Sequence, residues 1–123
     1  MAALLDTCIL VDLLRRSSPA QEFLLALPER PRVCPVSTLE LYAGARSQRE
    51  ERRIDAMLAT FERVGIDDVV FQHAGSLLRH YRSSHALDIP DALIAATAEQ
   101  HGLALATLND EHFPMFKQLK AAY

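Results

Sequence analysis

The beginning of the chain carries the pattern that decides the fold, since residues 2–16 read AALLDTCILVDLLRR. Residues 2–5 are a short apolar run that ends at Asp6, which is typical of a buried strand. Residues 7–16 follow with apolar side chains spaced to share one face of a helix, namely Ile9, Leu10, Leu13 and Leu14. A buried strand that leads directly into an amphipathic helix predicts an α/β domain.

The alternation of strands and helices continues along the chain. Further strands are expected at residues 32–36 and 103–107, with short extended pieces within residues 64–70. Helices are expected at residues 20–27, 37–46, 47–61, 72–85 and 88–101, the last ended by Gly102. This order predicts an open, mostly parallel sheet flanked by helices.

Length and composition describe one ordinary globular domain over residues 1–123, with 50% hydrophobic and 24% charged residues. No apolar run approaches the roughly 18–20 residues that span a bilayer, and the N-terminus lacks a basic leader. We therefore expect a cytoplasmic protein without a membrane segment. Cys8 and Cys34 form no metal-binding pair, and the net charge of −3 does not by itself indicate a nucleic-acid binder.

Four carboxylates fall at or near the predicted carboxyl ends of strands, or at the start of a helix beside them. These are Asp6, Glu40, Asp91 and Asp110. In an open parallel sheet, sites form in the crevice beyond these strand ends. The topology can therefore gather four acids that are distant in sequence.

Each acid also has a purely structural explanation. Asp6 can cap the helix that follows it, and Asp110 can open a short C-terminal helix. Ser37 and Glu40 fit a capping box, with the acid in the first turn. Asp88 can cap the helix that contains Asp91, where the helix dipole favours both acids. Capping does not explain why the acids collect at one edge of the sheet, so their combination favours a site.

Gathered carboxylates repel one another unless a cation or shared protons compensate them. Oxygen-only ligands suit Mg²⁺ or Mn²⁺, and such an ion can activate water and neutralise charge on a phosphodiester. The sequence contains no GxSxG nucleophile motif and no glycine-rich phosphate-binding loop. The residues therefore favour metal-assisted phosphodiester chemistry.

Four segments, in this order and spacing, resemble the motifs of PIN-domain nucleases, and the length resembles that of VapC toxins. They are Leu4–Leu10 (LLDTCIL), Ser37–Arg46 (STLELYAGAR), Pro90–Ala98 (PDALIAATA) and Leu105–Phe113 (LATLNDEHF). The resemblance covers most of the chain. It implies a PIN-like three-layer α/β/α fold with a short, mostly parallel sheet.

The resemblance also implies an activity and partners. It implies an endoribonuclease toxin that hydrolyses RNA with a metal-activated water, depends on Mg²⁺ or Mn²⁺, forms a homodimer and is inhibited by a VapB-type antitoxin. Asp6 and Asp91 would bind the metal, and Glu40 would be a third site carboxylate beside Thr7. In the fourth motif, Asp110 is our choice of carboxylate with Asn109 as an orienting neighbour, although Asn109 and His112 also occupy positions typical of the family.

Two surfaces follow as expectations. Arg46 and Arg49 could contact RNA phosphates beside the acidic crevice, although the interleaved Glu50 and Glu51 also suit a solvated helix face. An antitoxin helix would need an apolar groove between helices. Candidate groove residues, which core burial would explain equally well, are Leu24, Leu27, Tyr42 and Phe61.

Two other functions remain open at this stage. A non-catalytic interaction domain on a PIN scaffold would bind partners without cleaving RNA. A receiver-like phosphoacceptor module would also suit the length and the α/β alternation, but it needs an acid pair after the first strand. Here Asp6 is followed by Thr7.

Overall fold

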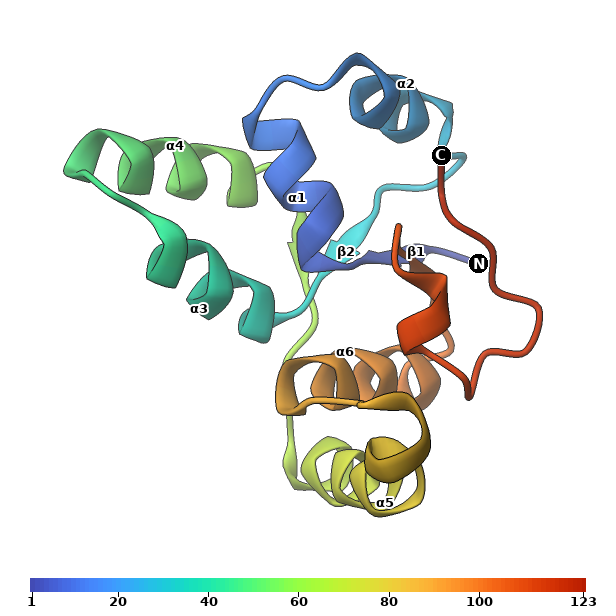
Figure 1. Cartoon of the computed structure of the whole chain (residues 1–123). Helices are drawn as coiled ribbons and strands as arrows, with labels where there is room; N and C mark the ends of the chain where they lie inside the picture. The colour runs from blue at the N-terminus through green and yellow to red at the C-terminus, as the bar shows by residue number, and fades with distance from the viewer.

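The computed structural model describes residues 1–123. The strands are β1 (Ala3–Leu5), β2 (Arg32–Val33), β3 (Glu62–Arg63) and β4 (Ala104–Ala106). The helices are α1 (Thr7–Leu14), α2 (Ser18–Ala26), α3 (Pro35–Gly44), α4 (Gln48–Leu58), α5 (Asp68–His85), α6 (Ile89–Gln100) and the short 3₁₀ helix η1 (Asp110–His112). Figure 1 shows the helices arranged around the small sheet, as the sequence predicts.

The four strands form one parallel sheet in the order β3-β2-β1-β4. In the centre, Leu5 of β1 pairs with Val33 on one side and with Ala106 on the other. The chain therefore leaves β1 toward β2 and β3, and later returns to add β4 on the opposite side of β1. This reversal places the switch point of the sheet between β1 and β4, and open α/β sheets bind their ligands at the carboxyl ends of the strands at such a point.

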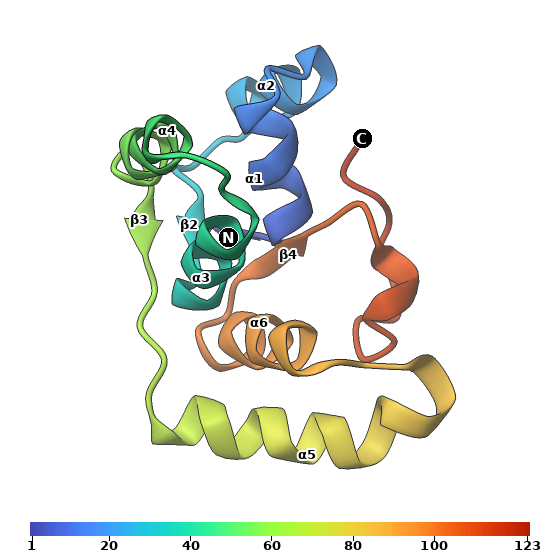
Figure 2. The same cartoon turned by 60° about the vertical axis from the view of Figure 1, so that its left-hand side comes forward.

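The two faces of the sheet carry separate cores, because successive side chains of a strand point to opposite faces. Leu4 and Leu105 belong to the core shared with α5 and α6, whereas Leu5 and Ala106 belong to the core shared with α1, α3 and α4. Figure 2 shows α6 next to the sheet and α5 on the far side of α6. The three-layer α/β/α prediction is confirmed.

Helix α6 is the most deeply buried helix, and every residue from Ala92 to Ala98 is buried. It ends as predicted at Gly102, which has a φ of +63°. The N–H groups of Gly102 and Leu103 donate to the carbonyls of Glu99 (3.4 Å) and Ala98 (2.9 Å). These bonds satisfy the free carbonyls of the last helical turn and direct the chain into β4.

Two local predictions are wrong. Strand β2 ends at Val33 and α3 begins at Pro35, so Glu40 lies in the second turn and Ser37 does not cap the helix. Proline favours the first helical position because its φ is already helical and it has no N–H to satisfy. The extended pieces expected within residues 64–70 are also absent, since Asp67 caps α5 and residues 68–70 are helical.

No helix of this chain has both the length and the apolar character that a membrane crossing requires.

Candidate active site

Asp6 lies at the carboxyl end of β1, between β2 and β4, and only 5% of it is exposed. Its backbone N–H donates to the Ala106 carbonyl (2.9 Å), which continues the β1–β4 ladder by one residue. The two carboxylate oxygens accept from different donors. Oδ1 accepts from the Thr7 N–H (2.8 Å) and Oδ2 from the Thr107 hydroxyl (2.7 Å). The expected cap is therefore present, but a second donor from another strand also orients the carboxylate.

Thr107, which the sequence analysis missed, is the residue that holds Asp6 from β4. It is fully buried, and its Oγ1 accepts from the backbone N–H of Asn109 (3.0 Å) while donating to Asp6. Its carbonyl accepts from the N–H of Ala122 (2.8 Å). Asn109 thus acts through its backbone, since its exposed side chain makes no hydrogen bond. Because Leu5 pairs with Ala106, the next residues of the two strands, Asp6 and Thr107, are neighbours. This pairing is known only from the structure, so the sequence alone offers no signal for Thr107.

Glu40 reaches the same edge of the sheet from α3. The Thr7 hydroxyl lies 2.6 Å from Glu40 Oε1, to which it donates, and 2.8 Å from the hydroxyl of Ser37. Ser37 is fully buried inside the first turn of α3, where its hydroxyl contacts Thr7. The supporting role predicted for Thr7 therefore has a physical basis, because Thr7 contacts both Asp6 and Glu40.

Asp91 completes the group from the first turn of α6. Asp88 caps this helix, and its Oδ1 accepts from the Asp91 N–H (2.9 Å). The pKa of Asp91 rises from 3.8 to about 7, first because burial disfavours its charge and then because Asp88, Asp6 and Glu40 repel it. Three acids predicted from separate motifs thus act on one another at a single edge of the sheet.

The fourth motif contributes differently from the prediction. Asp110 is the first residue of η1, and its side chain forms no hydrogen bond or ion pair with the other three acids. His112 instead approaches the group, with Nδ1 at 3.7 Å from Asp91 Oδ2. The role of Asp110 as a site carboxylate stays a prediction, and His112 is the closer neighbour.

A cysteine also borders the site. The Sγ of Cys8 lies 3.5 Å from Asp6 Oδ2 and 3.6 Å from Thr107 Oγ1. Burial first, and then the charge of Asp6, raise the pKa of this thiol above its ordinary value. A raised pKa leaves little thiolate at neutral pH, which argues against a cysteine nucleophile.

The donor set is made of carboxylate oxygens, the ligands that a hard divalent cation prefers, and burial first and the neighbouring acids second raise the pKa of Asp91. In the metal-free arrangement, no group of three or more His, Cys, Asp or Glu side chains is close enough together to hold an ion. Mg²⁺ commonly binds through one or two carboxylates and keeps several waters. The arrangement therefore suits an open metal site.

The predicted surface residues lie on two neighbouring hollows. Arg46 lines a pocket of about 450 Å³ between α1, α3 and α4, whereas Arg49 is exposed outside it. Leu24 and Phe61 line a second hollow of about 380 Å³ between α1, α2 and α4. Leu27 and Tyr42 do not line that hollow, and the Tyr42 hydroxyl donates to Asp55.

Comparisons with known proteins agree with this architecture. The chain matches the PIN domain family over residues 3–119. It is 41% identical to Ribonuclease VapC10 of Mycobacterium tuberculosis, over 98% of this chain and 92% of that protein. It is 37% identical to Ribonuclease VapC19 of the same species, over 98% of each protein.

A solved structure of the same fold adds to these relatives. The chain superposes on a chain of a toxin-antitoxin complex from Klebsiella pneumoniae with a TM-score of 0.83 and 31% identity, covering 99% of this chain and 98% of that one. A match over nearly the whole chain excludes a receiver module. The chain belongs to the PIN domain family and, within it, to the VapC proteins.

Proposed function

We propose that this protein is the ribonuclease toxin of a toxin–antitoxin pair and hydrolyses RNA phosphodiester bonds. The observation that carries the proposal is the meeting of Asp6, Glu40 and Asp91 at the carboxyl edge of the sheet, where Asp91 has a pKa of about 7. The relatives named ribonucleases, which match almost the whole chain, support the same activity.

Asp6 and Asp91 would hold a Mg²⁺ or Mn²⁺ ion, with Glu40 as the third carboxylate. When bound, such an ion would lower the pKa of a water molecule and offset charge on the phosphodiester. Its binding would also relieve the repulsion that raises the pKa of Asp91. The role of Asp110 at this site is the least supported of the four, because no contact joins it to the other acids.

The protein's own residues fix the geometry of the site. Thr107 and the Thr7 N–H hold the two oxygens of Asp6, so its carboxylate is oriented before substrate arrives. The Thr7 hydroxyl holds Glu40 in the same way. Orienting charged groups in advance removes a reorganisation cost from the reaction. The site is thus suited to charge stabilisation more than to covalent catalysis.

An antitoxin of the VapB type and a second copy of the chain are the proposed protein partners. The Klebsiella pneumoniae relative was solved as a toxin-antitoxin complex. The hollow lined by Leu24, Met57 and Phe61 has the apolar character that an amphipathic helix needs. We propose this hollow as the antitoxin-binding surface. Leu27 and Tyr42 do not line it and are not part of the proposed surface.

The decisive experiment is cleavage of a mixed RNA pool by the purified, antitoxin-free protein with Mg²⁺, with Mn²⁺ and with EDTA. Asp91→Asn is compared with Asp68→Asn, since Asp68 is an exposed acid of α5 whose side chain bonds only to Gln72 and to none of the three site acids. We expect metal-dependent cleavage that Asp91→Asn lowers at least 100-fold and Asp68→Asn leaves within twofold. Cleavage that persists in EDTA would refute the metal, and a folded, metal-replete protein without cleavage would favour a non-catalytic binding domain.

A further inference from the structure

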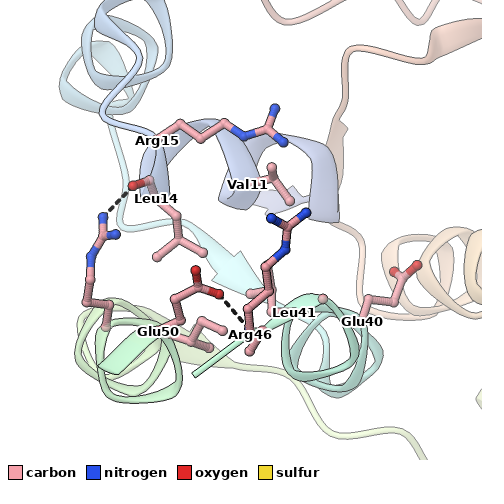
Figure 3. A pocket seen from close by; sticks show the side chains of 11 residues that line it. Val11, Leu14, Arg15, Glu40, Leu41, Arg46 and Glu50 are labelled. Atoms are coloured by element: carbon pink, nitrogen blue, oxygen red, sulfur yellow. Dashed lines mark hydrogen bonds between the residues drawn. The ribbon is translucent and has the colours of Figure 1, made fainter. Parts of the chain in front are cut away.

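The pocket between α1, α3 and α4 directly adjoins the acidic site. It has a volume of about 450 Å³, within the range of pockets that bind small ligands. Figure 3 shows its lining as side chains from these helices. The lining residues are Val11, Leu14, Arg15, Glu40, Leu41, Gly44, Ala45, Arg46, Glu50, Arg53 and Ile54.

Two arginines of this pocket have no charged partner. Arg15 and Arg46 take part in none of the ion pairs of the chain, and their guanidinium groups donate no hydrogen bond. In Figure 3 both guanidinium ends lie on the same side of the pocket, above and below Val11. Two guanidinium groups without an ion-pair partner in one pocket favour the binding of an anion.

The other charged groups of the pocket each have a hydrogen-bond partner, which for Glu40 is the Thr7 hydroxyl (2.6 Å). Glu50 Oε2 accepts from the backbone N–H of Arg46 (2.7 Å), so this carboxylate is directed away from the guanidinium of Arg46. The guanidinium of Arg53 donates to the Leu14 carbonyl. The free positive charge of the pocket is therefore concentrated on Arg15 and Arg46.

The remaining wall is apolar and comes from α1, α3 and α4. Val11, Leu14, Leu41 and Ile54 supply it. A pocket with a cationic mouth and an apolar wall matches a nucleotide, which has an anionic phosphate and a flat, largely apolar base. Guanidinium groups pair with phosphate oxygens through two parallel N–H donors and also stack on bases.

Glu40 links this pocket to the acidic site. It lines the pocket, and its charge also helps to raise the pKa of Asp91. An RNA strand that passes from the acidic site toward α1 and α4 meets Arg15 and Arg46.

We propose that this pocket is a binding subsite for one nucleotide of single-stranded RNA beside the cleaved bond, with the phosphate on Arg15 and Arg46 and the base against the half-buried Val11 and Leu14. The inference rests on the proposed ribonuclease function and names the substrate contacts of that site. It adds Arg15 to the predicted contact Arg46, and it assigns no role to Arg49. Single strands suit such a pocket because their bases can leave the stack.

The test measures binding separately from cleavage. The probe is a fluorescein-labelled, mixed-sequence, single-stranded 12-nucleotide RNA, bound in EDTA to the Asp91→Asn protein and followed by anisotropy. Arg15→Gln and Arg46→Gln are each expected to weaken binding about tenfold and to reduce the slope of log affinity against log salt by about one. The double variant should weaken binding by less than the product of the two effects, because both groups hold one phosphate.

Arg52→Gln and Arg82→Gln are the matched controls, since both residues are exposed and lie outside the pocket. They should change binding less than twofold. The same four variants with an intact Asp91 are assayed for cleavage in Mg²⁺, where only Arg15→Gln and Arg46→Gln should lower kcat/KM. Thermal melting confirms that each variant is folded.

Equal affinities for the pocket and control variants would overturn the subsite while leaving the ribonuclease function intact, provided the wild type still cleaves. A wild type that neither binds nor cleaves RNA would overturn both. A third outcome would assign the pocket to a peptide partner. In that case a hexaglutamate peptide would bind in a manner that needs Arg15 and Arg46, while RNA binding would not need them.

Discussion

The two principal acids of the site lie in opposite environments. Asp6, at the end of β1, is surrounded by donors, because the Thr7 N–H and the Thr107 hydroxyl each hold one of its oxygens. Asp91, at the start of α6, is half-buried and faces Asp88, Asp6 and Glu40, and burial first and these charges second raise its pKa to about 7. The hydrogen bonds at the sheet edge therefore orient the Asp6 carboxylate, whereas Asp91 at the start of α6 has other negative side chains around it. A cation would gain most from the uncompensated charge around Asp91.

The largest expected effect comes from Asp6→Asn, which keeps the size and shape of the side chain but removes its negative charge. We expect at least a 100-fold loss of metal-dependent cleavage, measured on the mixed RNA pool, because the amide is a poor ligand for a hard cation. The free energy of unfolding should change by only about 1 kcal/mol, since an amide oxygen can still cap α1. A variant that unfolds would show that Asp6 serves mainly as a helix cap.

Thr107→Val tests whether orientation of Asp6 matters. Removing the hydroxyl frees Asp6 Oδ2 and leaves the Asn109 N–H without its acceptor. We expect about a tenfold lower kcat and a loss of stability of about 1–2 kcal/mol, measured by cleavage kinetics and by urea unfolding.

Thr97→Val is the matched control, because Thr97 is an equally buried threonine whose hydroxyl donates to the Leu93 carbonyl (2.7 Å) far from the acids. It should lose comparable stability and keep its kcat. Equal activity losses in the two variants would mean that Thr107 contributes only to packing.

The charge accumulated around Asp91 predicts a pH-dependent stability in metal-free protein. Because the pKa of Asp91 is higher in the folded state than its ordinary value of 3.8, the folded state binds this proton more tightly. The resulting stabilisation is complete below about pH 3.8 and disappears as the pH rises through about 7. Asp91→Asn should therefore stabilise the protein at pH 8, by on the order of 1 kcal/mol, and should not do so at pH 4.

Urea unfolding in EDTA at the two pH values measures this effect, with Asp68→Asn as the control. Added Mg²⁺ should raise the melting temperature of the wild type more than that of Asp91→Asn. The same stability change for Asp91→Asn at both pH values would show that the acids do not repel one another as described.

The smallest expected effect on activity belongs to Asp110. Its side chain makes no contact with the other acids, so Asp110→Asn should lower cleavage by only a few-fold. His112→Gln is the informative companion, because His112 approaches Asp91 at 3.7 Å. If Asp110→Asn is as damaging as Asp6→Asn, Asp110 is a full member of the acid site.

Much of the site was predictable because its acids follow recognisable local patterns. Asp6 comes directly after an apolar run, and Asp91 stands in the first turn opened by Asp88 and Pro90. Glu40 was predicted in the right place for the wrong reason, since Pro35 begins α3 earlier than the Ser37 capping box suggested. The start of a helix depends on a few neighbouring residues, and here Pro35 and the Ser37–Glu40 capping box predicted different starts for α3.

The sequence by itself determined the strand and helix alternation and the apolar α6, and it singled out Asp6, Glu40 and Asp91 as candidate site acids, because these depend on spacing within one or two turns of chain. Only the tertiary structure decided that Thr107 holds Asp6 across 101 residues and that Arg15 and Arg46 face one pocket. Such pairings depend on strand register and helix packing. Strand register and helix packing join residues that are far apart in the sequence, so the pattern of neighbouring residues does not predict them.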